Sequence, residues 1–204
     1  MPLIKRFFQI SCKGEECLKL AELIREKAPA VEYMDIEIRE DALRITMYGY
    51  KTDIKNAWEY IRRLVSSYRS SIITTRHGLR RIKIEYLVEK TSRTFPPILL
   101  VEILKYKGYK AILSDYKDEI ITDAEPKVLE ELAVKIFDVI NKIRFDVRGT
   151  VAKYYVAATS IILGVEPEQV IEKGILYGHL YRDEDGKIRI KKEWRQALAE
   201  LLRQ

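Results

Sequence analysis

This 204-residue sequence is poor in the residues that build catalytic and metal sites. It has two cysteines, Cys12 and Cys17, and two histidines, His77 and His179. A single cysteine pair with four residues between its members is not a zinc site, so we interpret both cysteines as small, buried apolar side chains. No nucleophile motif accompanies either histidine, and we interpret both as structural residues. These absences favour a protein without a metal, a cofactor or a catalytic centre.

The sequence also lacks the motifs of nucleotide binding and the segments of membrane insertion. Neither glycine-rich phosphate-binding pattern occurs. No apolar run approaches the roughly 20 residues that a membrane-spanning helix needs. The N-terminal residues lack the apolar segment and the cleavage site of a secretory signal. We therefore expect a cytoplasmic protein without membrane contact.

Amide side chains are scarce as well, with two Asn and four Gln against 37 basic and 31 acidic residues. This balance is typical of thermophilic proteins.

Two groups of acidic residues resemble cation-binding sites. The segment Asp183 to Gly186 lacks the ligand spacing of a calcium loop and has Trp194 at the twelfth position, so a hairpin turn is favoured. Asp35 and Glu37 alternate on one strand, which favours an exposed strand face over a carboxylate pair.

The hydrophobic pattern of residues 1–75 predicts a βαββα unit. Its expected elements are a strand, a helix, two strands and a second helix, at 4–12, 15–27, 31–39, 43–48 and from Thr52 or Asp53 onward. Such units usually form a ferredoxin-like, split-βαβ sheet with the helices on one face.

Residues 76–145 repeat the same order of elements. The expected positions are a strand, a helix, two strands and a helix, at 81–88, 98–106, 110–116, 119–122 and 126–143. Both second helices follow a Thr-Asp pair, at 52–53 and 122–123. We interpret this recurrence as a structural duplication.

Residues 146–204 show a different pattern. Two helices, at 148–163 and 167–177, precede a hairpin over 180–190 and a last helix over 192–202. Helix, turn, helix and hairpin are the outline of a winged helix. The predicted fold class is therefore α/β (α+β), with two βαββα units in tandem and a helical, winged-helix-like C-terminal module.

Three features of this layout match a known family. They are the paired βαββα units, the segment Ile-Ile-Thr-Asp-Ala at 120–124, and the tail segment 163–172, which leads into Asp-Gly-Lys-Ile at 185–188. With these features, most of the chain resembles a family of conserved archaeal proteins of unknown function. The resemblance implies an archaeal source and implies no activity.

The net charge of +6 is concentrated in residues 62–93, which hold nine basic and two acidic side chains. Seven of the nine are arginines, whose planar forks match phosphate oxygens, and serines and threonines lie between them. Such a segment favours contact with a phosphate backbone. The alternative is a solvated basic surface that pairs with acidic helices elsewhere in the fold.

A second observation concerns the first predicted sheet. If its apolar residues face the helices, the opposite face carries Phe7, Tyr33, Arg39, Arg44, Thr46 and Tyr48. RNA-recognition folds stack bases on aromatic side chains at such positions. The sequence pattern that usually marks such strands is missing from 43–50, and packing of the second unit over this face would explain the aromatics equally well.

The sequence thus favours a non-catalytic RNA-binding protein whose ligand is ribosomal or another stable RNA. The candidate RNA-binding residues are Arg62, Arg63, Arg69, Arg76, Arg80, Arg81, Lys83, Phe7, Arg44 and Tyr48. The alternatives are a DNA-binding regulator that uses the C-terminal module, a protein-interaction scaffold and an enzyme for a phosphorylated metabolite. The C-terminal module is also a candidate site for a protein partner. Three carboxylates, at 166, 168 and 172, would repel the phosphates of a DNA duplex. They argue against an insertion of the helix 167–177 into the major groove.

Overall fold

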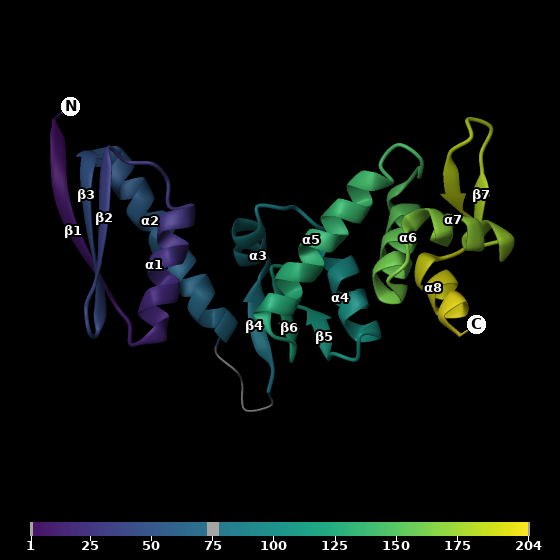
Figure 1. Ribbon diagram of the computed structural model, residues 1–204, viewed down its shortest axis with the longest axis horizontal. Helices are drawn as coiled ribbons and strands as arrows, with labels where there is room; N and C mark the ends of the chain where they lie inside the picture. The colour runs from purple at the N-terminus through teal and green to yellow at the C-terminus, as the bar shows by residue number, and fades with distance from the viewer. Residues whose placement is uncertain (1, 73–77, 204) are drawn as a thin grey trace. The chain divides into compact units, whose positions relative to one another are not determined.

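The computed structural model describes residues 2–72 and 78–203 (Figure 1). The chain divides into two compact units, Met1–Ile72 and Ile73–Gln204, called unit 1 and unit 2 below. Both combine helices with small antiparallel sheets, as the sequence predicts. No helix within the two described ranges is both long enough and apolar enough to cross a bilayer.

Unit 1 is a three-stranded sheet with two helices. Its elements are β1 (Leu3–Ser11), α1 (Glu15–Lys27), β2 (Tyr33–Ile38), β3 (Ala42–Tyr50) and α2 (Lys51–Ile72). The strand order is β1-β3-β2, and β3 is antiparallel to both neighbours. Since β1 and β2 are joined through α1 and separated by β3, this is the predicted split-βαβ arrangement.

Strand alternation separates the two faces of this sheet. Leu43, Ile45 and Met47 of β3 are fully buried, on the face where α1 and α2 pack (Figure 1). On the same face, Phe8 of β1 stacks on Trp58 of α2 with ring centroids 4.3 Å apart. Because successive side chains of a strand point to opposite faces, the intervening residues of β1 and β3 lie on the other face.

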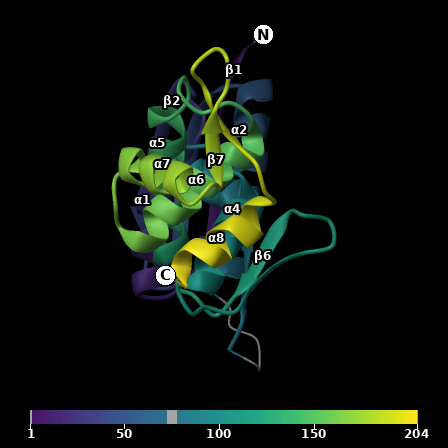
Figure 2. The same cartoon turned by 90° about the vertical axis from the view of Figure 1, so that its right-hand side faces the viewer.

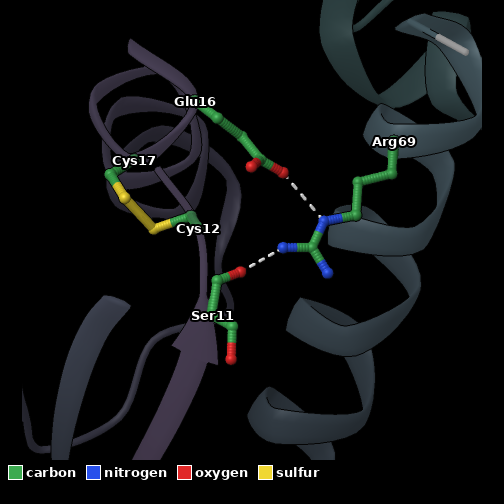
Figure 3. Close-up of a disulfide and its surroundings, with 5 residues drawn as sticks. All are labelled: Ser11, Cys12, Glu16, Cys17 and Arg69. Carbon is green, nitrogen blue, oxygen red and sulfur yellow. Dashed lines mark hydrogen bonds and ion pairs between the residues drawn. A yellow bond between two sulfur atoms is a disulfide. The ribbon is translucent and has the colours of Figure 1, made fainter. Parts of the chain in front are cut away.

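Cys12 and Cys17 form a disulfide between the end of β1 and the first turn of α1 (Figure 3). Gly14 lies between them with φ 53°, and this left-handed turn brings the two Cα atoms to 5.2 Å. The expectation that both side chains are buried is confirmed. The interpretation as two unpaired cysteines is wrong, because spacing alone does not reveal the tight turn.

The disulfide gives a first prediction for stability. Closing a loop of about six residues restricts the unfolded chain and stabilises the folded unit by about 2 kcal/mol. We expect a reductant to accelerate hydrogen exchange in peptides of unit 1 by roughly thirtyfold. A Cys12→Ala/Cys17→Ala variant should exchange fast with or without reductant. Equal protection of the oxidised and reduced protein would contradict this role.

Unit 2 begins with a second small sheet. Its first elements are β4 (Arg80–Lys83), α3 (Ile84–Thr91), α4 (Pro97–Tyr106), β5 (Ala111–Leu113), β6 (Glu119–Thr122) and α5 (Pro126–Lys142). The strand order β4-β6-β5 again places the last strand between the other two, antiparallel to both. The split-βαβ arrangement of unit 1 therefore recurs, with two helices instead of one in the crossover.

The extra helix corrects the predicted strand at 81–88. The strand ends at Lys83, which pairs with Glu119, the first residue of β6. Beyond this point β6 offers no further partner, and the backbone N–H of Ile84 donates to the carbonyl of Asp118. The following residues form α3, which buries Tyr86 and Leu87. Alternation in the sequence cannot show that the neighbouring strand is only four residues long.

The remaining elements follow the predicted order. They are α6 (Thr150–Leu163), α7 (Pro167–Leu176), β7 (Leu180–Arg182), β8 (Ile188–Ile190) and α8 (Trp194–Leu202). Helix α6 packs against α7 and α8 (Figure 2). The β7–β8 hairpin turns at Asp183, whose carboxylate accepts the backbone N–H groups of Asp185 and Lys187 and pairs with Arg189.

A buried polar cluster lies within this helical part. His179 is 2% exposed, and its Nδ1 lies 3.0 Å from the hydroxyl of Tyr155. Its Nε2 lies 3.1 Å from a carboxylate oxygen of Glu200, which also accepts from the ammonium of Lys192. Both ring nitrogens of His179 thus have partners within the fold, in line with the interpretation of this residue as structural, whereas His77 lies outside the described residues.

The cluster gives a second prediction. Burial raises the pKa of Tyr155 to about 12 from 10.0, and the charge of Glu200 acts in the same direction. Because the folded-state pKa is the higher one, this group's stabilisation is fully present below pH 10 and is lost between about pH 10 and 12. We expect the unfolding free energy of unit 2 to fall there by about 1.4 kcal/mol per pH unit.

Chemical denaturation at a series of pH values from neutral to alkaline measures this loss. Tyr155→Phe removes the titrating hydroxyl and should flatten the alkaline decline, although its stability at neutral pH is lower. The same alkaline slope in both proteins would assign the decline to other groups.

Candidate nucleic-acid interface

The helix-free face of the unit 1 sheet is the strongest candidate site, and we call it the open sheet face. The strand register defines its residues as Leu3, Lys5, Phe7, Gln9, Tyr33, Asp35, Glu37, Arg44, Thr46, Tyr48 and Tyr50. The predicted aromatic face is thus confirmed for Phe7, Tyr33, Arg44, Thr46 and Tyr48. Lys5, Gln9 and Tyr50 were not among the predicted residues of this face, although their two-residue spacing from Phe7 and Tyr48 places them on it.

Phe7 is the most accessible aromatic side chain of β1, with 56% of its surface exposed. The guanidinium of Arg44 lies 5.0 Å from the centre of its ring, and the ammonium of Lys5 lies 5.3 Å from it. Both are cation–π contacts. One exposed ring and two cations therefore occupy the side of the face formed by β1 and β3.

Tyrosines extend this surface across the sheet. Tyr33 of β2 is the direct neighbour of Tyr48 of β3, which in turn opposes Lys5 of β1. Tyr33 is 56% exposed and Tyr48 is 39% exposed. Aromatic side chains therefore lie on all three strands of the open sheet face, with Phe7 of β1 in the row next to that of Tyr48 and Tyr33.

Charge is unevenly distributed over the open sheet face. Lys5 and Arg44 lie on β1 and β3, whereas Asp35 and Glu37 lie on β2. Glu37 is exposed and pairs with Arg39 at 3.1 Å. The expectation of an exposed strand face holds for Glu37, while Asp35 is half-buried. An anion is therefore favoured near β1 and repelled near β2.

A pocket of about 370 Å³ lies at the Phe7 end of this face. Its lining includes Phe7, Gln9, Arg39, Asp41 and Arg44. An aromatic ring, an amide and two guanidinium groups thus line one small pocket.

Metal ligation is a separate question. Within the described ranges, no three His, Cys, Asp or Glu side chains lie close enough together to hold a metal ion.

Several arginines of the basic segment are engaged in the fold. Arg69, near the end of α2, binds Glu16 of α1 at 2.9 Å and donates to the carbonyl of Ser11 at the end of β1 (Figure 3). It therefore joins three elements beside the disulfide. Its guanidinium is directed at these protein groups and not toward the open sheet face.

The arginines of β4 are paired as well. Arg80 contacts the carboxylate of Glu125 at 2.6 Å and donates to the carbonyl of Asp123, and its side chain is only 18% exposed. Arg81 lies 3.5 Å from Glu119 and is 62% exposed. These contacts match the alternative interpretation of the segment, in which its charge pairs with acidic groups of the fold.

The other candidates of the segment are dispersed. Arg62 and Arg63 are exposed on α2, which packs on the opposite side of the sheet from the open sheet face. Lys83 is half-buried at the end of β4, and Arg76 lies outside the described residues. Residues 62–72 belong to unit 1 and residues 78–93 to unit 2. Their contact with RNA stays a prediction.

The acidic helix of the C-terminal module is also engaged. Lys142 of α5 binds Glu166 at 2.6 Å and Glu168 at 3.2 Å, both at the start of α7. These hydrogen bonds raise the pKa of Lys142. Carboxylates anchored at this position keep the N-terminal end of α7 negative, which is unfavourable for a helix that enters a DNA groove.

Comparison with known proteins places this chain among archaeal proteins. Residues 11–199 match the family described as "Uncharacterized protein conserved in archaea (DUF2067)". The chain belongs to this family. It is also similar to "Uncharacterized protein MJ0388" of Methanocaldococcus jannaschii, with 26% identity over 203 residues that cover 95% of this chain and 90% of the relative. No solved structure matches the chain.

Arg69 and Arg62 provide a matched test on this DUF2067 protein, because both lie on α2. Arg69→Gln breaks the ion pair with Glu16 and leaves the Ser11 carbonyl without its donor. We expect a loss of about 1 kcal/mol in unit 1, seen as faster hydrogen exchange in β1 and α1. Arg62→Gln should change the exchange little. Equal effects of the two substitutions would argue against a structural role for Arg69.

Proposed function

We propose that this protein binds single-stranded RNA on the open sheet face of unit 1 without acting on it chemically. The observation that carries the proposal is the exposed Phe7 ring with the cations of Lys5 and Arg44 over it. An exposed aromatic ring on a sheet is a stacking platform for a base, because every base presents a π-face. Cations beside the ring supply the complementary contact to the phosphates.

Phe7, Tyr48 and Tyr33 together define a path for an RNA single strand, diagonally from β1 to β3 and then to β2. One base stacks on Phe7, and its neighbours stack on Tyr48 and Tyr33, which follow across the sheet. The base on Phe7 takes the position of the two cations, which remain within reach of the adjoining phosphates. The acidic residues of β2 keep the phosphate backbone on the β1 side of the bases.

Single strands fit this surface better than a duplex does. In a duplex the bases are stacked on one another and cannot lie on protein rings, whereas in loops and ends they are free to do so. The acidic start of α7 also disfavours the rival proposal of a DNA-binding regulator. The exposed side chains of Arg62 and Arg63 on α2 contribute long-range attraction for a polyanion.

A direct test measures the binding of a fluorescein-labelled uridine dodecamer to the full chain by anisotropy. Base stacking contributes about 1–3 kcal/mol per aromatic side chain, so Phe7→Ala should weaken binding by roughly fivefold to a hundredfold. Arg44→Gln should lower the affinity and make the salt dependence shallower. With three phosphates contacted, the slope of log K against log salt is about −2.

Tyr116→Ala is the matched control, because Tyr116 is an aromatic side chain of unit 2 that is 91% exposed. Its removal should leave the affinity unchanged. A duplex of the same length should bind more weakly than the single strand. Absence of binding by the wild-type chain, or unchanged binding by a Phe7→Ala/Tyr48→Ala variant, would refute the proposal.

The proposed setting is the cytoplasm of a thermophilic archaeon. A disulfide is unusual in a cytoplasmic protein, but intracellular proteins of hyperthermophilic archaea are an exception. The Cys12–Cys17 bond, the scarcity of amide side chains and the archaeal family support this setting together.

A further inference from the structure

The outer edge of β1 is a second unassigned surface of unit 1. Strand β1 is nine residues long and pairs with β3 on one side only. Among the described residues, no strand pairs with its other side, and Figure 1 shows β1 at the margin of the sheet. The backbone N–H and C=O groups along this edge are a template for another strand.

The topology of unit 1 explains why this edge is open. A complete βαββαβ unit has a sixth element, a strand that returns after the second helix to lie beside β1. In unit 1 the chain enters the 22-residue helix α2 after β3, and the unit ends with this helix. Within residues 2–72, no returning strand therefore covers this edge.

The sequence of β1 is complementary to itself when two copies run antiparallel about Phe7. Residue i then lies opposite residue 14 − i, so Leu3 faces Ser11, Ile4 faces Ile10 and Phe7 faces Phe7 of the other copy. Lys5 lies opposite Gln9 and Arg6 opposite Phe8. Every charged side chain thus meets an uncharged one, and all nine residues are paired.

Neighbouring registers are worse. A shift that keeps the two faces of the sheet in line must move the strand by two residues. The shift in one direction places Arg6 opposite Arg6, and like charges directly opposite are destabilising. A shift in either direction also leaves two residues of each strand unpaired. The register centred on Phe7 is therefore selected by both charge and length.

We infer that two copies of this chain form a symmetric dimer through their β1 edges, with a continuous six-stranded sheet. The pairing adds about one backbone hydrogen bond for each paired residue. The twofold axis is perpendicular to the sheet, so the helices of both copies lie on one side and the two open sheet faces form one surface. The inference does not depend on RNA binding, because the edge and the face are different surfaces.

Gln9 and Lys5 provide the decisive variants. Gln9→Lys puts a lysine opposite Lys5 of the second copy, twice by symmetry, and should weaken the dimer roughly threefold to thirtyfold. Gln9→Glu should tighten it. Lys5→Glu combined with Gln9→Lys restores opposite charges and should recover most of the loss. Sedimentation velocity of the full chain over about a hundredfold concentration range, without RNA, measures each dissociation constant.

Two features of the design isolate the contact between copies. Residue 9 of β1 is paired with Arg44 of β3 within the same chain. Gln9→Lys and the double variant both place a lysine beside Arg44, so this contact within the chain is the same in both. Glu37→Lys makes a charge change on the opposite edge, at β2, and should leave the dimer unaffected. Thermal unfolding of each variant verifies that unit 1 is folded.

Three results would overturn the inference. One is a wild-type chain that sediments as a monomer over the whole range. Another is a dimer whose dissociation constant is the same in the wild type, Gln9→Lys and Gln9→Glu. The third is a series of oligomers whose size increases with protein concentration and whose association is weakened by Glu37→Lys. Such a series would indicate head-to-tail pairing of β1 with β2 of the next copy.

Discussion

The insertion of β3 between β1 and β2 is the constraint on which unit 1 depends. It aligns the three strands so that Leu43, Ile45 and Met47 meet the helices from the centre of the sheet. Since strand side chains alternate, this burial also determines which residues face the other way. The aromatic and basic character of the open sheet face is therefore set by the same register that builds the core.

The sequence predicted the helices and strands whose hydrophobic residues recur at a regular spacing over several residues. The alternation at Met34, Ile36 and Ile38, followed by that of β3, identified the strands and both faces of the first sheet. The helices of the C-terminal module were equally visible, because Pro167 and the glycine at 164 mark their boundaries. In these segments the local pattern and the tertiary packing agree.

The errors arose where a distant partner decides the structure. The residues after Lys83 alternate as a strand does, but they form α3 because the neighbouring strand β6 is short. The disulfide was missed because it depends on a glycine turn of positive φ. The site was only partly predictable for a similar reason. The charge pattern of the sequence indicates the basic segment, but only the tertiary fold brings Arg69 and Arg80 into contact with carboxylates.

The position of the disulfide has a consequence for how the protein is made. Both cysteines lie within six residues, so they are adjacent as soon as β1 and the first turn of α1 have left the ribosome. The chain contains no third cysteine, so within one chain no incorrect pairing exists. Oxidative maturation therefore needs an electron acceptor but no enzyme that reshuffles bonds. It also does not have to wait for the synthesis of α2.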